Sequence, residues 1–149
     1  MRFELLTLAG VKYAGDVTQV SLTTVDGEIG ILPHHERLTA IAAPGPVTVR
    51  VGAKKEVFAT FGGLLEVTAE RVRLLSDEAD HLDDLIESEI EAAIELAQAL
   101  KSAAKDKREL SHAQQMIDRQ AVRLNVARMR RHGRPDQTPV ASDDQHAPR

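Results

Sequence analysis

The chain has 149 residues, a formal net charge of −4, an aromatic content of 3%, and neither cysteine nor tryptophan. The absence of cysteine excludes disulfides, thiolate metal sites and cysteine nucleophiles, and the negative charge argues against a dedicated nucleic-acid-binding protein. Because no apolar run reaches the roughly 20 residues of a membrane span and no signal peptide precedes the first strand-like segment, we expect a soluble protein of the cytoplasm.

The first half of the chain has the pattern of short β-strands. Alternating runs such as Val47-Thr48-Val49-Arg50-Val51 are separated by turn signals, among them Asp26-Gly27, Pro44-Gly45-Pro46 and Gly62-Gly63. Short strands with turns at nearly regular spacing are typical of a β-sandwich or a flattened barrel. We therefore predict a β-sandwich domain at residues 1–80.

The second half of the chain has a helical period. From about Leu82 the apolar residues recur at steps of three and four, and they do so again after a polar break at residues 105–109. Ser111 and Gln114 have the form of a capping box, and Gly133 with Pro135 ends the pattern. We predict an all-β plus α fold, with an antiparallel α-helical hairpin at residues 81–134 and a disordered tail at residues 135–149.

The two predicted helices differ in charge. Residues 77–110 carry eleven acidic and four basic side chains, whereas residues 111–134 carry six arginines and one acid, Asp118. We expect the acidic helix and the arginine-rich helix to face each other. Because their apolar stripes are rich in alanine, the pairing should be weak and the hairpin should act as a movable element.

No pattern in the sequence indicates catalysis. The cluster His34-His35-Glu36 could suggest a metal, but adjacent side chains point apart and no third ligand is identifiable, so we favour a surface-loop or interface role. The serines lack a Gly-x-Ser-x-Gly elbow, and the glycines do not form a phosphate-binding loop. We therefore expect a protein that is not an enzyme and that binds no cofactor or metal.

Four segments in unbroken order resemble the epsilon subunit of the rotary (F-type) ATP synthase. They are residues 15–20, Asp26 to His35 (DGEIGILPHH), Pro44-Gly45, and Phe61 to Val67 (FGGLLEV). The resemblance covers residues 1 to about 131. It implies a central-stalk rotor subunit of a proton-translocating ATP synthase, peripheral at the cytoplasmic face of the cell membrane. The sandwich would join the gamma subunit to the c ring, and the hairpin could extend to the alpha/beta catalytic head and inhibit ATP hydrolysis.

The resemblance also implies roles for particular residues. The segment that faces gamma and the c ring in the family carries Glu28, Gly30, Pro33 and His35 here, although simple solvation of the loop is the alternative for Glu28 and His35. The second helix would make inhibitory contacts with the catalytic head through Arg119, Arg123 and Arg128. In the folded-down hairpin we expect these arginines to meet the carboxylates of the first helix instead.

One departure from the family concerns ATP. Some members carry an aliphatic-Asp-x-x-Arg-Ala motif in the first helix that binds ATP. The matching stretch here is Leu82 to Glu87 (LDDLIE), which has Ile86 in place of the arginine and Glu87 in place of the alanine. We expect ATP to bind poorly or not at all, because a cation that would pair with phosphate is missing.

Two other classes of protein remain as alternatives. A free-standing adaptor with a sandwich and a hairpin, unconnected to an ATPase, would not explain the ordered family segments. A nucleic-acid-binding module built on the second helix is disfavoured by the net charge of −4 and the acidic neighbouring helix.

Overall fold

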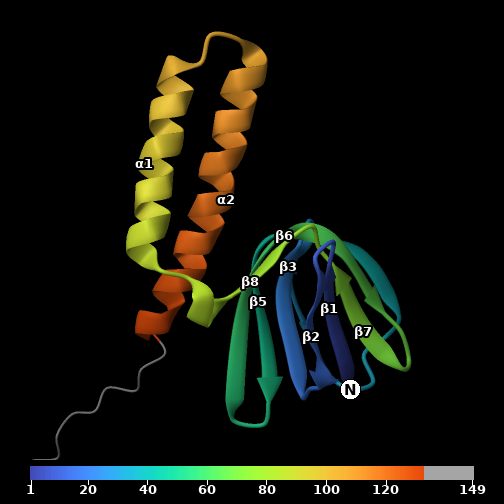
Figure 1. Ribbon diagram of the computed structural model, residues 1–149. Helices are drawn as coiled ribbons and strands as arrows, with labels where there is room; N and C mark the ends of the chain where they lie inside the picture. The colour runs from blue at the N-terminus through green and yellow to red at the C-terminus, as the bar shows by residue number, and fades with distance from the viewer. Residues whose placement is uncertain (133–149) are drawn as a thin grey trace, which may run out of the picture.

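The computed structural model describes residues 1–132, which form a sandwich of β-strands with a helical hairpin standing beside it (Figure 1). The strands are, in chain order, β1 (Arg2–Thr7), β2 (Gly10–Asp16), β3 (Gln19–Thr24), β4 (Gly27–Ile31), β5 (Leu38–Val51), β6 (Lys54–Val67), β7 (Arg71–Leu75) and β8 (Ala79–His81). They are followed by a short 3₁₀ helix, η1 (Leu82–Asp84), and by α1 (Glu87–Ala103) and α2 (Lys107–His132). The predicted fold class is confirmed, and the tail predicted at residues 135–149 lies outside the described residues.

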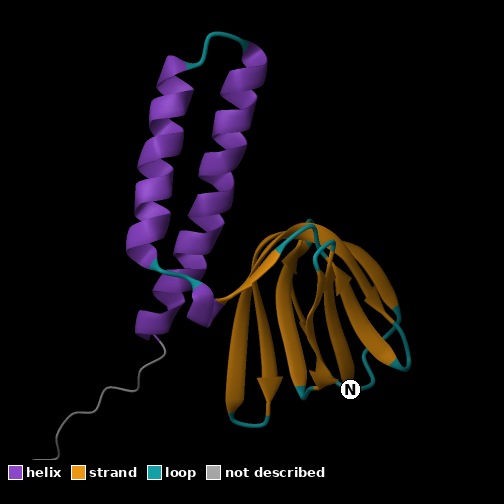
Figure 2. Ribbon diagram, in the orientation of Figure 1, coloured by secondary structure: helices purple, strands orange, loops and turns teal. Residues whose placement is uncertain are grey.

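The strands form one part of the molecule and the helices another (Figure 2). The long strands β5 and β6 belong to both layers of the sandwich, because different parts of them pair with different strands. They pair with each other along their whole length, from Leu38 opposite Val67 to Val51 opposite Lys54. The other side of β6 pairs with β8 at residues 58–60 and with β7 at residues 64–67. One layer therefore has the strand order β2-β1-β7-β6-β5, and the other has the order β8-β6-β5-β3-β4.

The core of the sandwich lies between these layers and follows the alternation of the sequence. In the parallel pair of β1 and β7, Phe3 lies opposite Val72 and Leu5 opposite Leu74, and all four side chains are buried. Phe3 also contacts the ring of Tyr13, with the two centroids 5.8 Å apart. This apolar cluster draws its members from residues 1–79, so the sandwich has a core of its own.

Glycine is required where β5 and β6 pass from one layer to the other. Gly63 has a φ of +138°, a backbone conformation that L side chains rarely adopt. A Cβ atom at this position would lie 1.9 Å from the carbonyl oxygen of Leu75 in β7. The Gly62-Gly63 pair therefore lets the backbone of β6 bend and approach β7 at the corner of the sandwich.

The first helix begins later than the apolar pattern predicts. Leu82 and Leu85 fit the helical stripe, but Leu85 and Ile86 are extended, and α1 starts at Glu87. Tertiary contacts hold this backbone outside the helix, because Arg130 of α2 donates hydrogen bonds to the carbonyl oxygens of Leu82 and Leu85. Leu82 and Leu85 nevertheless pack into the apolar cluster beneath the hairpin. The prediction of helix from Leu82 was wrong for this physical reason.

The second helix begins earlier than predicted. Asp106 accepts a hydrogen bond from the backbone N–H of Glu109 at 2.8 Å, and the Glu109 carboxylate accepts one from the N–H of Lys105 at 2.9 Å. The contact with Asp106 satisfies one free donor of the first turn, and the Glu109 carboxylate binds the backbone just before the helix, so α2 starts at Lys107. The capping box predicted at Ser111 is wrong, because Ser111 already lies inside the helix.

Candidate interaction surfaces

The edge strand β4 carries two of the residues that the family resemblance singles out. In the antiparallel pair with β3, Glu28 lies opposite Thr23 and Gly30 opposite Ser21, and both Glu28 and Gly30 are exposed. Since they are two residues apart in a strand, they lie on the same face. This face has a shallow hollow of about 420 Å³ whose lining includes Glu28, Gly30, Ser21 and Thr48.

Gly30 leaves this hollow open because it has no side chain; its backbone conformation does not require glycine. Its φ lies outside the left-handed region, and an added Cβ would meet Gln19 Nε2 at 3.6 Å and Ser21 Oγ at 3.9 Å, which are ordinary contacts. A larger side chain is therefore compatible with the strand. It would, however, fill the space into which a partner's side chain could fit.

A tight turn follows β4 and displays the two histidines. The backbone N–H of His35 donates to the carbonyl oxygen of Leu32 at 3.1 Å, with Pro33 and His34 at the centre of the turn. His34 has a φ of 67°, which is the conformation that the third position of a type II turn requires and that usually selects glycine. The imidazole of His34 is exposed, whereas His35 is half-buried with Nδ1 2.8 Å from the carbonyl oxygen of Glu36. A left-handed residue that is not glycine is a feature often found at functional sites.

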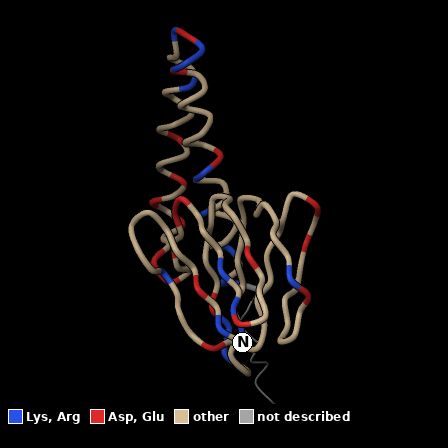
Figure 3. Tube along the Cα trace, turned by 90° about the vertical axis from the view of Figure 1, so that its right-hand side faces the viewer, with Lys and Arg blue, Asp and Glu red and all other residues tan. Residues whose placement is uncertain are grey.

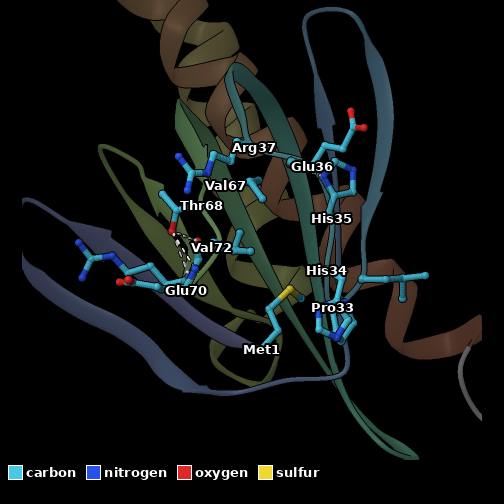
Figure 4. Close-up of a pocket in the computed structure, with 13 residues that line it drawn as sticks. Met1, Pro33, His34, His35, Glu36, Arg37, Val67, Thr68, Glu70 and Val72 are labelled. Atoms are coloured by element: carbon cyan, nitrogen blue, oxygen red, sulfur yellow. Dashed lines mark hydrogen bonds between the residues drawn. The ribbon is translucent and has the colours of Figure 1, made fainter.

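This turn forms one wall of a hollow of about 510 Å³ at the end of the sandwich where the N-terminus lies (Figure 4). Met1 extends into it, and the opposite wall is the turn between β6 and β7, which the Thr68 hydroxyl closes by donating to the carbonyl oxygen of Arg71 at 3.0 Å. The charged residues of the lining are two arginines and two glutamates: Arg37, Arg71, Glu36 and Glu70. With the two imidazoles, this mixture suits a polar protein loop that offers both donors and acceptors.

The predicted interface residues lie along one edge of the sandwich and do not form a single cluster. Glu28 is at the start of β4 and Pro33 is beyond its end, so they are roughly 17 Å apart at ~3.4 Å per residue. His35 lies further on, in the hollow with Met1. A partner must therefore run along the edge strand to contact all of them. Among residues 1–132, no group of three His, Asp or Glu side chains could hold a metal ion.

An exposed apolar patch on the outer face of the other layer was not anticipated from the sequence. The strand register places its members side by side on five adjacent strands; they are Val11, Leu6, Leu75, Leu64 and Ile41. Leu6 is half-buried, and the exposed fractions of the other four run from 39% for Leu64 to 64% for Val11. Contiguous apolar surface of this kind marks protein interaction sites.

The sequence does contain a signal for this apolar patch. Strands β1, β6 and β7 each carry two consecutive leucines, Leu5-Leu6, Leu64-Leu65 and Leu74-Leu75. Successive side chains of a strand point to opposite faces, so one leucine of each pair enters the core and the other lies on the outer face. Leu5, Leu65 and Leu74 are fully buried. Assigning the inner and outer leucine required the register of the sheet.

The arginines of α2 bind acids in two places. Arg119 and Arg123 contact Glu78 and Asp80, which precede α1, rather than the carboxylates of α1. Farther along, Arg128 lies 3.4 Å from Glu91, and Arg131 lies 2.8 Å from Glu87, both on α1. The expected pairing with the first helix is therefore confirmed for Arg128 and wrong for Arg119 and Arg123.

The tip of the hairpin also carries side chains of both charges (Figure 3).

Comparison with known proteins identifies relatives over most of the chain. The family model of the ATP synthase delta/epsilon chain β-sandwich domain matches residues 1–81. The ATP synthase epsilon chain of Herpetosiphon aurantiacus is 32% identical over 131 residues, which are 88% of this chain and 96% of that protein. The epsilon chain of Chloroflexus aggregans is 31% identical over 129 residues, 87% of this chain and 93% of that protein.

A solved structure shares the fold. A chain in the cryo-EM structure of the Euglena gracilis mitochondrial ATP synthase (OSCP, F1 and c-ring) superposes with a TM-score of 0.66 and 23% identity, covering 87% of this chain and 78% of that one. None of the helices within residues 1–132 is long and apolar enough to cross a membrane. The matched domain, the near-complete coverage of the relatives and the shared fold lead to one conclusion: the chain belongs to the ATP synthase epsilon chain family.

Proposed function

We propose that this chain is a non-catalytic central-stalk subunit of an ATP synthase, which couples the gamma subunit to the c ring. The observation that carries the proposal is the alignment of the chain with almost the full length of relatives named ATP synthase epsilon chains. Its surfaces suit assembly rather than catalysis, because they combine an exposed edge strand, a polar hollow and an apolar patch. The subunit would lie peripherally at the cytoplasmic face of the membrane, held there by the c ring.

The chemistry of the surfaces suggests how the two partners divide them. The hollow beside Pro33 and His35 has a mixed polar lining, which suits the polar loops of a ring of membrane subunits. The apolar patch suits the gamma subunit, because lasting interfaces are more apolar than transient ones. Glu28 and Gly30 lie on the edge strand β4, which leads away from this hollow, and they would extend the contact along the edge.

The hairpin would be a movable element in this assembly. In the structure, Arg119 and Arg123 are bound to acids of the same chain. In an extended hairpin these arginines, with Arg128, would be available to acidic surfaces of the alpha/beta catalytic head. The extended hairpin would then obstruct ATP hydrolysis, whereas the docked hairpin would not.

Co-purification of the tagged full-length chain with gamma and the c ring tests the proposal. We expect Gly30→Val and Leu64→Glu to fold but to weaken assembly, since the first fills the hollow on β4 and the second places a charge in the apolar patch. Val51→Glu is a matched control, because Val51 is also exposed but lies at the β5–β6 turn, away from both surfaces. A folded wild-type chain that retained neither gamma nor the c ring would contradict the proposal and favour a free-standing adaptor.

A further inference from the structure

The hairpin has a small apolar contact with the sandwich. Within residues 1–132, the second apolar cluster takes its sandwich members, Val57 and Ala59, from β6. The other buried members are Leu85 of the linker and Ile90, Val126 and Ala127 of the hairpin. Valine and alanine bury little surface, so this contact supplies a modest part of the hydrophobic stabilisation.

Charged groups make direct hydrogen bonds between α2 and the segment at residues 78–80. Arg119 Nη1 donates to Glu78 Oε1 at 2.6 Å, and Arg123 Nη2 donates to Glu78 Oε2 at 2.9 Å. Arg123 Nε also donates to Asp80 Oδ2 at 2.7 Å, and Asp80 belongs to β8. Both guanidinium groups lie over the ring of Phe61, at 5.3 and 4.7 Å from its centroid. Glu78 thus bridges two cations that an aromatic ring also holds.

A third arginine on the same side of α2 holds the connection between the two parts. Arg130 follows Arg119 by eleven residues, or three helical turns, and donates to the carbonyl oxygens of Leu82 and Leu85. One stripe of α2 therefore contacts β8 and the linker over residues 78–85. The hairpin cannot move away from the sandwich as a unit without breaking the contacts of Arg119 and Arg123.

We infer that Glu78 and Asp80 with Arg119 and Arg123 form an electrostatic latch, which holds the hairpin in its docked position and which salt opens. The side chains of Glu78 and Arg119 are 49% and 39% exposed, so dissolved ions reach them. Pairing of α1 with α2 buries Ala97 and Ala113. Because salt screens charges and does not weaken apolar contacts, we expect this pairing to remain when the latch opens. The latch is a mechanism for the hairpin movement in the proposed function. It rests on that movement and not on assembly with gamma and the c ring.

Distances between paired spin labels on the isolated full-length chain test the latch. The chain contains no cysteine, so Ala53→Cys and Ser102→Cys, both exposed, place single labels on the β5–β6 turn and near the tip of the hairpin. From about 0.1 M to about 1 M salt, where the Debye length falls from ~10 Å to ~3 Å, we expect the single docked distance to give way to a broad distribution. A second pair, Ser88→Cys with Asn125→Cys, reports on α1 and α2 and should not change.

Neutral variants separate the latch from general charge effects. Glu78→Gln with Asp80→Asn should raise the ratio of undocked to docked hairpin about tenfold at ~0.1 M salt, equivalent to ~1.4 kcal/mol. Glu89→Gln with Glu95→Gln, which removes two exposed acids from α1, is the matched control and should behave as the wild type.

Three results would overturn the latch. The first is a distribution for Glu78→Gln with Asp80→Asn that equals the control at every salt concentration. The second is a wild-type distance distribution that does not respond to salt. If circular dichroism shows that the variant is unfolded, this second result is sufficient by itself. The third is a salt-dependent distance within the hairpin, which would indicate melting. The spin-label measurement needs no partner, so a negative result leaves the co-purification test of the proposed function unaffected. Failure to co-purify with gamma and the c ring would likewise leave the test of the latch unaffected.

Discussion

Gly63 and Gly10 have similar φ angles, but only Gly63 lies close to the backbone of another strand. Comparing them therefore isolates the steric effect of that neighbouring backbone. Their φ values are +138° and +120°, but a Cβ would meet the Leu75 carbonyl oxygen at 1.9 Å in the first case and nothing within 4 Å in the second. We expect Gly63→Ala to lower the free energy of unfolding by about 3–5 kcal/mol and Gly10→Ala by about 1 kcal/mol. Urea unfolding of the two variants measures both values, and equal losses would contradict the steric argument.

His34 combines an unfavourable backbone conformation with an exposed side chain. We expect His34→Gly to leave the free energy of unfolding unchanged or to raise it by up to about 1 kcal/mol, because glycine adopts a φ of 67° without steric cost. The same variant should weaken co-purification with gamma and the c ring, since it removes an imidazole from the wall of the hollow. A clear loss of thermal stability would instead show that the imidazole supports the turn.

At the scale of elements, the start of α2 distinguishes the cap that the structure shows at Asp106 from the capping box predicted at Ser111. Asp106→Ala should lower the free energy of unfolding by about 1 kcal/mol, because it removes the side chain that accepts the Glu109 N–H. Ser111→Ala is the matched control and should change stability by less than about 0.5 kcal/mol, since Ser111 is exposed inside α2. Thermal unfolding followed by far-UV circular dichroism measures both. A larger loss for Ser111→Ala would show that Ser111, and not Asp106, caps the helix.

The hollow between the linker and the two helices bears on nucleotide binding. It measures about 310 Å³, and its lining includes three carboxylates, Asp80, Asp84 and Glu89, with Arg123 as its one arginine. Arg123 is bound to Glu78 and Asp80, so no free cation is offered to phosphate there. We expect calorimetry with millimolar magnesium-ATP to detect no saturable binding to the full chain. Saturation in the micromolar range would contradict this electrostatic argument.

The sequence pattern was sufficient to predict those strands that bury one of their two faces. In β3 and β7 every second side chain is buried, including Val20 and Leu74, so the alternation of apolar residues predicted both strands. The short strand β8 and the late start of α1 could not be predicted, because β8 depends on pairing with β6 and the linker on Arg130. The same limit applies to the candidate site. Glu28, Gly30, Pro33 and His35 stood out by resemblance, whereas the apolar patch required the register of five strands.

At the scale of the whole molecule, the sandwich and the hairpin have separate apolar clusters. We therefore expect a chain ending at Ile86, before α1, to fold and to join the ATP synthase. The truncated subunit should raise the rate of ATP hydrolysis by the assembled enzyme severalfold, because no helix remains to extend into the catalytic head. Circular dichroism of the truncated chain is the control for folding. Equal hydrolysis rates with the full-length and truncated subunits would show that the hairpin does not inhibit.

Coupling between hydrolysis and proton transport depends most directly on a subunit that joins gamma to the c ring. An ATP synthase depleted of its epsilon subunit can be reconstituted in liposomes with and without the full-length chain, and protons pumped per ATP hydrolysed can be measured in both. With the chain present we expect ATP-driven pumping to be restored, and with Leu64→Glu in the apolar patch we expect it to remain low. The same low pumping with and without the folded wild-type chain would contradict a role in the central stalk.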